Sequence, residues 1–341
     1  MDIYSPTELL GMVNSLENAP ITFLRDRYFG TEQTFATEAV NFDVVDKSRR
    51  LAPFVSPLVK GKVMEKEGYA TKYFRPAYVK PKTPINPTDA IKRMAGEAIG
   101  GSLSPAERRD AHVVSALAMH LEAIDMREEV MASEILRTGK CTIAGEGFGT
   151  VVLDFGRHAD LTKTLTGTAK WDNAAAVPLT NLGTWAGLVR THSNAVVSDV
   201  VCEPTAFAAM LARLSDADKQ ILFNSLRGSG STVELGPRLA EKVRYEGQIG
   251  QFRFWTYSDT YSDDNGASAD VMPAGTVILA SSALEGVRAY GAILDVDSLQ
   301  ETRSFPKMWV EQDPSRLWVM TQSAPVLAPL RPNASFAAKV L

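Results

Sequence analysis

The sequence predicts an α+β fold organised around one unusually long helix. An amphipathic pattern indicates that this helix spans residues 105–138. Strand patterns lie on both sides of it, and helices alternate with strands from about residue 160. A chain of 341 residues can bury a substantial core, and its length favours two or three domains.

The composition is that of a globular protein, with 45% apolar and 22% charged residues. No run is apolar enough to span a bilayer, and the N-terminus lacks the pattern of a secretion signal. We therefore expect synthesis in the cytoplasm and no membrane partner. Cys141 and Cys202 fit neither a disulfide framework nor a zinc site, and the four histidines show no metal-binding spacing, so we predict no metal or cofactor.

The charges are distributed unevenly along the chain. Residues 1–46 carry two basic and eight acidic side chains, a net charge of −6, whereas residues 47–93 carry twelve and three, a net charge of +9. The remainder carries 22 basic and 29 acidic side chains, a net charge of −7. Opposed charges of this kind within one chain favour attraction between copies.

The N-terminal residues predict a helix followed by a strand. Ser5, Pro6 and Glu8 form a helix start, with a capping hydroxyl, a proline in the first turn and a glutamate that reaches back. Residues 34–45 alternate between apolar and polar side chains, as strands do. This region has too few apolar residues for a core of its own, so we expect an arm that lies along another part of the chain.

Residues 54–82 predict two extended runs around a turn near Glu67 and Gly68. A two-stranded ribbon this polar is marginally stable alone. It could be a solvated flap, or a basic arm that docks on an acidic neighbouring copy. For the second interpretation, the predicted intersubunit contacts are Lys60, Lys62, Lys66, Lys72, Arg75, Arg108 and Arg109.

Capping residues mark both ends of the long helix. Ser104, Pro105 and Glu107 repeat the helix start of the N-terminal segment, and Gly139 is the expected stop. About 34 residues at a rise of 1.5 Å give a helix roughly 50 Å long. Several parts of the chain must therefore lie across it.

Further elements follow the long helix. Short strands are predicted at 141–143 and 150–155, and helices around Trp185 and from Pro204 and Ser215. Further strands are predicted at 195–202, 252–257, 276–280, 307–310 and 316–322. Residues 235–244 fit a helix or a strand, and we favour a helix. Residues 259–270 are predicted to form an acidic loop.

No catalytic motif is complete. Asp154-Phe155-Gly156 spells a kinase tripeptide, but the other kinase motifs are missing. The glycines between 145 and 149 lead into a strand pattern and not into a helix that could bind phosphate. We therefore predict no catalytic residue.

Several short segments together resemble a known family. They are R-P-A-Y-V-K-P-K (75–82), I-N-P (85–87), R-A-Y-G (288–291), F-P-K-M-W-V (305–310), D-P-S-R (313–316) and T-Q-S-A-P (321–325). In this order and with this chain length, the sequence resembles the lambda-like tailed-bacteriophage major capsid (head) protein family. The resemblance covers almost the whole chain.

The resemblance implies the Hong Kong 97-type phage capsid fold. Its parts would be an N-terminal arm (1–46), an extended E-loop hairpin (47–90), a P-domain (91–158) with a spine helix (105–138), and an α/β A-domain (159–290). The chain would then return to P-domain strands (291–324) and end in a strand (325–341) that joins the A-domain.

The resemblance also implies a function. Many copies would form an icosahedral shell of hexamers and pentamers around the double-stranded DNA of a tailed phage or prophage, without sequence-specific DNA binding. A separate scaffolding protein, a portal and a small decoration protein would be further partners; no lysine–asparagine crosslink is predicted. The alternatives are an encapsulin-like nanocompartment shell protein, or an α/β enzyme with an unrecognised site.

Overall fold

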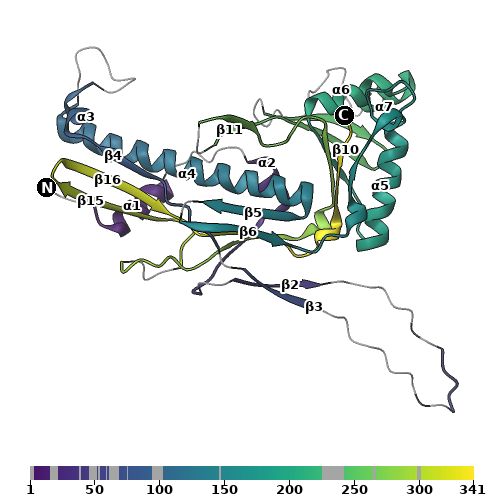
Figure 1. Ribbon diagram of the computed structural model, residues 1–341, viewed down its shortest axis with the longest axis horizontal. Coiled ribbons are helices and arrows are strands. Elements are labelled where there is room, and N and C mark those ends of the chain that lie inside the picture. The colour runs from purple at the N-terminus through teal and green to yellow at the C-terminus, as the bar shows by residue number, and fades with distance from the viewer. Residues whose placement is uncertain are drawn as a thin grey trace.

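A computed structural model describes most of the chain: residues 4–15, 22–37, 40–45, 52, 54–58, 60, 69–74, 76–93, 103–145, 147–224, 242–263, 266–297 and 301–341. Figure 1 shows an elongated body, with a long helix along one part and a group of shorter helices around a sheet at one end. A two-stranded ribbon projects away from the body.

The long helix, α4 (Pro105–Thr138), begins and ends as its capping residues predict. The hydroxyl of Ser104 accepts a hydrogen bond from the backbone N–H of Glu107, and the Glu107 carboxylate accepts one from the N–H of Ser104. At the other end, Gly139 has a φ of +72° and its N–H donates to the carbonyl of Ile135. Local side-chain chemistry therefore determines both ends of the helix.

The N-terminal half of α4 packs on a three-stranded sheet. The strand order is β15 (Phe305–Gln312), β16 (Ser315–Gln322), β4 (Lys82–Ile85), and a short helix α3 (Pro87–Ile91) follows β4. The predicted helix near Ser5 is α1 (Pro6–Ser15). Its Leu9 is completely buried with Val113, Leu117 and Val319 in a small core of its own. The strands predicted at 307–310 and 316–322 are present and longer than expected.

A six-stranded sheet forms the other end of the body. Its order is β7 (Thr162–Thr164), β18 (Ser335–Lys339), β13 (Thr276–Ala280), β8 (Asp199–Cys202), β10 (Phe252–Tyr257), β9 (Val243–Ile249). Three helices cover it, α5 (Pro178–Ser193) against β18, α6 (Pro204–Arg213) against β10 and α7 (Asp216–Asn224) against β9. Val200, Ile278 and Phe336 are fully buried in the main core.

Three predictions for this region need correction. The strand expected at 195–202 begins only at Asp199. Residues 243–244 belong to strand β9, not to a helix, because they pair with β10; residues 235–241 lie outside the described part. The expected acidic loop contains a hairpin, β11 (Thr260–Ser262) with β12 (Ser268–Asp270), because their backbones pair in register.

The middle of the body holds two smaller sheets and a short helix. One sheet has the order β1 (Thr31–Thr34), β14 (Gly286–Tyr290), β17 (Pro325–Pro329), so it joins the N-terminal segment to two late strands. The other pairs β5 (Lys140–Gly145) with β6 (Phe148–Asp154), as expected. The helix α2 (Phe23–Tyr28) was not predicted.

The projecting ribbon pairs different segments from those expected. Strand β3 (Tyr69–Phe74) runs antiparallel to β2 (Val40–Val45), and residues 54–58 contain no strand. The run expected at 34–45 is accordingly two strands, β1 and β2, in different sheets. The predicted turn at Glu67 and Gly68 lies outside the described residues. Val40 and Phe74 pair at the buried root of the ribbon, which explains the preference for this partner.

Candidate functional site

The predicted intersubunit residues do not form one patch. Lys60 is exposed, and Lys72 lies on the projecting strand β3. Arg108 and Arg109 lie instead in the first turns of α4, which Figure 1 shows at one end of the body. Lys62, Lys66 and Arg75 lie outside the described residues.

Arg108 and Arg109 make contacts within their own chain. A guanidinium nitrogen of Arg108 donates to the carbonyl of Ile91 over 3.4 Å, and Arg109 pairs with Asp110 at 2.9 Å. The Arg108 contact links the start of α4 to the end of α3, and the Arg109 pair lies within the first turns of α4. The two arginines therefore have a local structural role, whatever they contact in another copy.

Apolar side chains are exposed in residues 54–58, which lie between β2 and β3 in the sequence. Phe54 is 100% exposed and Leu58 is 96% exposed. Isolated apolar residues are common on protein surfaces, but a phenylalanine and a leucine without any cover in the same short segment indicate a contact surface. The sequence analysis considered only the charges of this region and missed these two residues.

The root of the ribbon is fixed in the main core. Val40 is fully buried, Phe74 is 6% exposed, and the Phe74 ring lies 5.3 Å from that of Phe155, centroid to centroid. Beyond this root, β2 and β3 form a sheet of two strands only. Two strands without a supporting layer are marginally stable in water, so the rest of the ribbon needs another surface.

The N-terminal arm is bound to α4 through the first turn of α2. Glu129 of α4 is completely buried, and its carboxylate accepts hydrogen bonds from the backbone N–H groups of Phe23, Leu24 and Arg25, over 2.8–3.1 Å. Burial raises the pKa of Glu129, and these N–H donors oppose the increase. Glu129 thereby takes the place of a cap that Thr22 does not provide.

A second group of buried charges secures the same contact. The Arg25 guanidinium pairs with Asp125 and Glu128 of α4, and Arg303 reaches the same two carboxylates. The hydroxyl of Tyr290 donates to Glu128 over 3.0 Å. Burial alone would lower the pKa of Arg25, but the neighbouring carboxylates raise it above its ordinary value. Each buried charge therefore has a partner, as stable burial requires.

The arm also contacts the six-stranded sheet. Asp199, at the start of β8, pairs with Arg27 of α2 at 2.9 Å and with Arg253 of β10 at 3.0 Å. The Arg27 guanidinium also lies 4.7 Å from the centre of the Trp255 ring. Helix α2 therefore links the long helix to the sheet domain.

The Arg157 side chain caps the C-terminal end of α4. Its guanidinium donates to the carbonyls of Leu136 and Arg137 over 2.6 and 2.5 Å, two acceptors without partners inside the helix. Burial lowers the pKa of Arg157 to about 10. The partial negative charge of the helix end favours the cation at this position.

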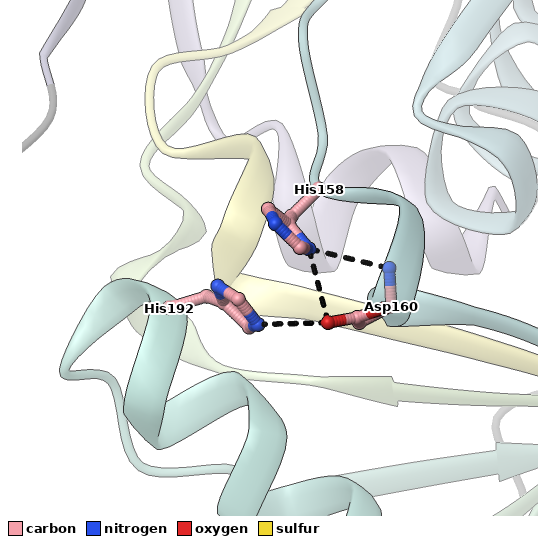
Figure 2. A group of neighbouring side chains, drawn as sticks. All are labelled: His158, Asp160 and His192. Atoms are coloured by element: carbon pink, nitrogen blue, oxygen red, sulfur yellow. Dashed lines mark hydrogen bonds and ion pairs between the residues drawn. The ribbon is translucent and has the colours of Figure 1, made fainter.

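A group of metal-ligating side chains lies between η1 (Ala159–Leu161) and the last turn of α5. Figure 2 shows His158, Asp160 and His192, whose ligand atoms all lie within 4.8 Å of one another. The two imidazole rings stack, with centroids 3.9 Å apart. Sequence spacing missed this group because the fold, and not a local motif, brings the two histidines together.

The helices in the described part of the chain are not of the membrane-spanning kind. None of the helices there combines the length and the apolar character needed to cross a bilayer.

Comparison with known proteins identifies a family. The family model described as "Phage major capsid protein E" matches residues 5–340. The chain is 31% identical to the major capsid protein of Escherichia phage lambda over 336 residues, which cover 96% of each chain. It is 30% identical to the major capsid protein of Enterobacteria phage phi80 over the full length of both.

Solved structures show the same fold. The crystal structure of a prophage capsid protein from E. coli CFT073 aligns with a TM-score of 0.77 and 23% identity, over 99% of both chains. The capsid of Ralstonia phage GP4 aligns with a TM-score of 0.57 and 13% identity, over 95% of this chain and 92% of that one. The predicted α+β capsid fold is confirmed, and the capsid interpretation is supported over a compartment shell or an enzyme. The chain therefore belongs to the phage major capsid protein E family.

Proposed function

We propose that many copies of this chain assemble into an icosahedral shell, made of hexamers and pentamers, that encloses the double-stranded DNA of a tailed phage. The exposed Phe54 and Leu58, next to a ribbon that has no supporting layer of its own, carry this proposal. Burying them on a neighbouring copy would remove apolar surface from water and give the ribbon the cover that it lacks.

The predicted division into domains belongs to the same proposal. The arm (1–46) and the E-loop (47–90) reach other parts of the shell, and α4 is the spine of a P-domain (91–158 and 291–324). The A-domain (159–290, joined by 325–341) organises the rings. The six-stranded sheet, which takes β18 from the last of these segments, supports this division.

The proposed partners follow from the role in the shell. A separate scaffolding protein, a portal and a small decoration protein complete the particle. The capsid chain itself is made in the bacterial host cytoplasm before it enters the virion. A net charge of −4 suits a wall that confines DNA without binding its sequence. We propose no catalytic activity and no cofactor.

Substitution of Phe54 and Leu58 by serine tests the proposal. We expect F54S/L58S to keep the circular dichroism spectrum and melting temperature of the wild type, because both side chains are exposed. Electron microscopy and size-exclusion chromatography should show free subunits or small rings in place of shells. Expression with the remaining head proteins supplies the assembly partners.

The matched control is F54L/L58M, which keeps apolar side chains of similar size at both positions. It should assemble as the wild type does. Normal shells from F54S/L58S would contradict the proposal that these residues form a contact between copies. Loss of shells from both variants would instead point to a requirement other than apolar contact.

A further inference from the structure

We propose that His158, Asp160 and His192 form a binding site for a divalent transition-metal ion of the Zn²⁺ class. The ligand atoms are Nδ1 of His158, Oδ2 of Asp160 and Nε2 of His192. Figure 2 shows that these atoms converge from the loop before η1 and from the end of α5. The inference concerns the A-domain region and does not depend on the assembly contacts proposed above.

Nδ1 of His158 presents a lone pair, not a proton, to Asp160. Nδ1 of His158 accepts a hydrogen bond from the backbone N–H of Asp160 over 3.3 Å, which assigns the ring proton to Nε2. Nδ1 also lies 3.5 Å from the carboxylate oxygen of Asp160, and a metal ion bound to Nδ1 would take the lone pair from the N–H of Asp160. Two acceptors that face each other repel, and a cation placed between them removes the repulsion.

Two of the three distances between the ligand atoms match those around one metal ion, and the two histidine nitrogens lie within 4.8 Å of each other. Oδ2 of Asp160 lies 3.5 Å from Nδ1 of His158 and 3.6 Å from Nε2 of His192. A tetrahedral ion with bonds of about 2.0–2.2 Å separates its ligand atoms by roughly 3.3–3.6 Å. Two imidazoles and one carboxylate favour zinc and its neighbours over magnesium or calcium, which prefer oxygen ligands.

The backbone that carries the ligands is held in place. The N–H of His158 donates to the side-chain carbonyl of Asn333 over 2.8 Å, and the neighbouring Leu161 and Val189 are fully buried. His192 lies in the last turn of α5, whose partial negative charge favours a cation. The site is therefore presented by fixed elements and not by a free loop.

Coordination requires one ring to turn about its Cβ–Cγ bond. The rings are inclined by only 22°, so their in-plane lone pairs lie in two nearly parallel planes and do not meet at one point. The His158 side chain is 48% exposed and the His192 side chain 22% exposed, which leaves room for this rotation. Metal binding should consequently break the stacking of the two rings and leave at least one coordination position open to solvent.

Isothermal titration of the purified chain with Zn²⁺ tests the site, with Co²⁺ as a visible-absorption probe of the ligand geometry. We expect about one ion per subunit and a higher melting temperature with metal. H158A and H192A should each lower the affinity for Zn²⁺. Loss of a residue that only supports a metal ligand typically costs roughly 10- to 100-fold in affinity, and loss of a ligand should cost more. H158A/H192A should abolish binding.

The matched control is H112A, which removes a half-buried histidine of α4 outside the group. It should bind Zn²⁺ as the wild type does. Equal binding by the wild type and H158A/H192A would overturn the proposal, as would an equal loss in H112A. Circular dichroism and melting without metal verify that each variant is folded. In the wild type, Zn²⁺ should shift the NMR signals of the His192 ring. If D160N no longer shows these shifts, the Asp160 carboxylate is the third ligand.

Discussion

Gly139 and Arg157 lie close together at the end of α4. A Cβ atom added to Gly139 would lie 2.6 Å from the Cβ of Arg157, and the residue has a φ of +72°. The left-handed backbone and the close approach both favour glycine at this position. The end of the long helix therefore depends on the absence of one side-chain carbon.

We expect G139A to lower the free energy of unfolding by about 1–3 kcal/mol, because it adds a strained backbone and a close contact. Urea unfolding measures the change. The matched control is G183A, on an exposed part of α5 where an added Cβ has no neighbour within 4 Å. That variant should be about 0.5–1 kcal/mol more stable, because alanine is the better helix former. A change of the same sign in the free energy of unfolding of both variants would contradict this account of Gly139.

His120 of α4 is buried between two hydroxyl groups. Its Nε2 lies 2.8 Å from the Thr83 hydroxyl, and its Nδ1 lies 3.2 Å from that of Thr321. Burial lowers the pKa of His120 to about 4 from its ordinary value of 6.5. The neutral ring can donate one hydrogen bond and accept the other, so both hydroxyls are satisfied without a charge.

This pKa gives the protein a defined pH dependence. The unfolded chain binds a proton near pH 6.5 and the folded chain only near pH 4, so the contribution to stability is complete above pH 6.5 and decreases as the pH falls toward 4. The loss should reach up to roughly 3 kcal/mol. H120Q, which keeps a donor and an acceptor, should reduce the slope of stability against pH between 6.5 and 4.5. Urea unfolding at several pH values measures it, and an unchanged slope would contradict the assignment.

At the scale of elements, the sequence predicts best what neighbouring residues determine. Ser104, Glu107 and Gly139 lie within or next to the turns that they cap, so both ends of α4 were predicted correctly. Helix α2 was missed because its first N–H groups bind Glu129, more than 100 residues away. The predicted partner of β3 was wrong for a similar reason, since the packing of Val40 and Phe74, which are far apart in the sequence, favours the observed one.

The contact between α2 and α4 should depend strongly on Arg25. R25A would leave Asp125 and Glu128 buried with only the partly exposed Arg303 as a cation, so we expect a loss of about 3–5 kcal/mol of stability. Limited proteolysis should also cut the arm faster. The matched control is K140A, which breaks an ion pair with Asp154 between half-exposed side chains and should cost less than about 1 kcal/mol. Similar losses in both variants would contradict a special role for the buried group.

At the scale of the whole molecule, the fold could be predicted and the pairing of its strands could not. The family resemblance predicted the capsid fold, which the solved structures confirm, and the division of the chain into an arm, a hairpin, a spine and an α/β domain stays a prediction. The order of the six-stranded sheet depends on contacts between residues far apart, such as Ala337 with Thr162, and no local pattern contains it. The group of His158 and His192 was missed for the same reason.

The charge layout leads to a prediction for assembly. Residues 47–93 carry a net charge of +9, and the flanking blocks carry −6 and −7. Reversal of Lys60, Lys62, Lys66 and Lys72 to glutamate should leave the subunit folded but block shell formation, because each copy both gives and receives the contact. A single reversal should be mostly tolerated, since exposed ion pairs are individually weak.

Circular dichroism and electron microscopy check this prediction. The matched control replaces the same four lysines by arginine, which keeps the charge and should permit assembly. Normal shells from the glutamate variant would show that these lysines are only solvated, which is the other interpretation of the basic region.

The position of β18 in the six-stranded sheet has a consequence for synthesis. This strand, residues 335–339, lies between β7 and β13 and pairs with both. After β7 has been made, the ribosome needs on the order of 10–30 s to reach β18 at usual rates of elongation. Until then β7 has no partner in this sheet and β13 has one free edge, and unpaired edges are sites of aggregation. The six-stranded sheet can be completed only after translation has passed residue 339, and its open edges favour aggregation until then.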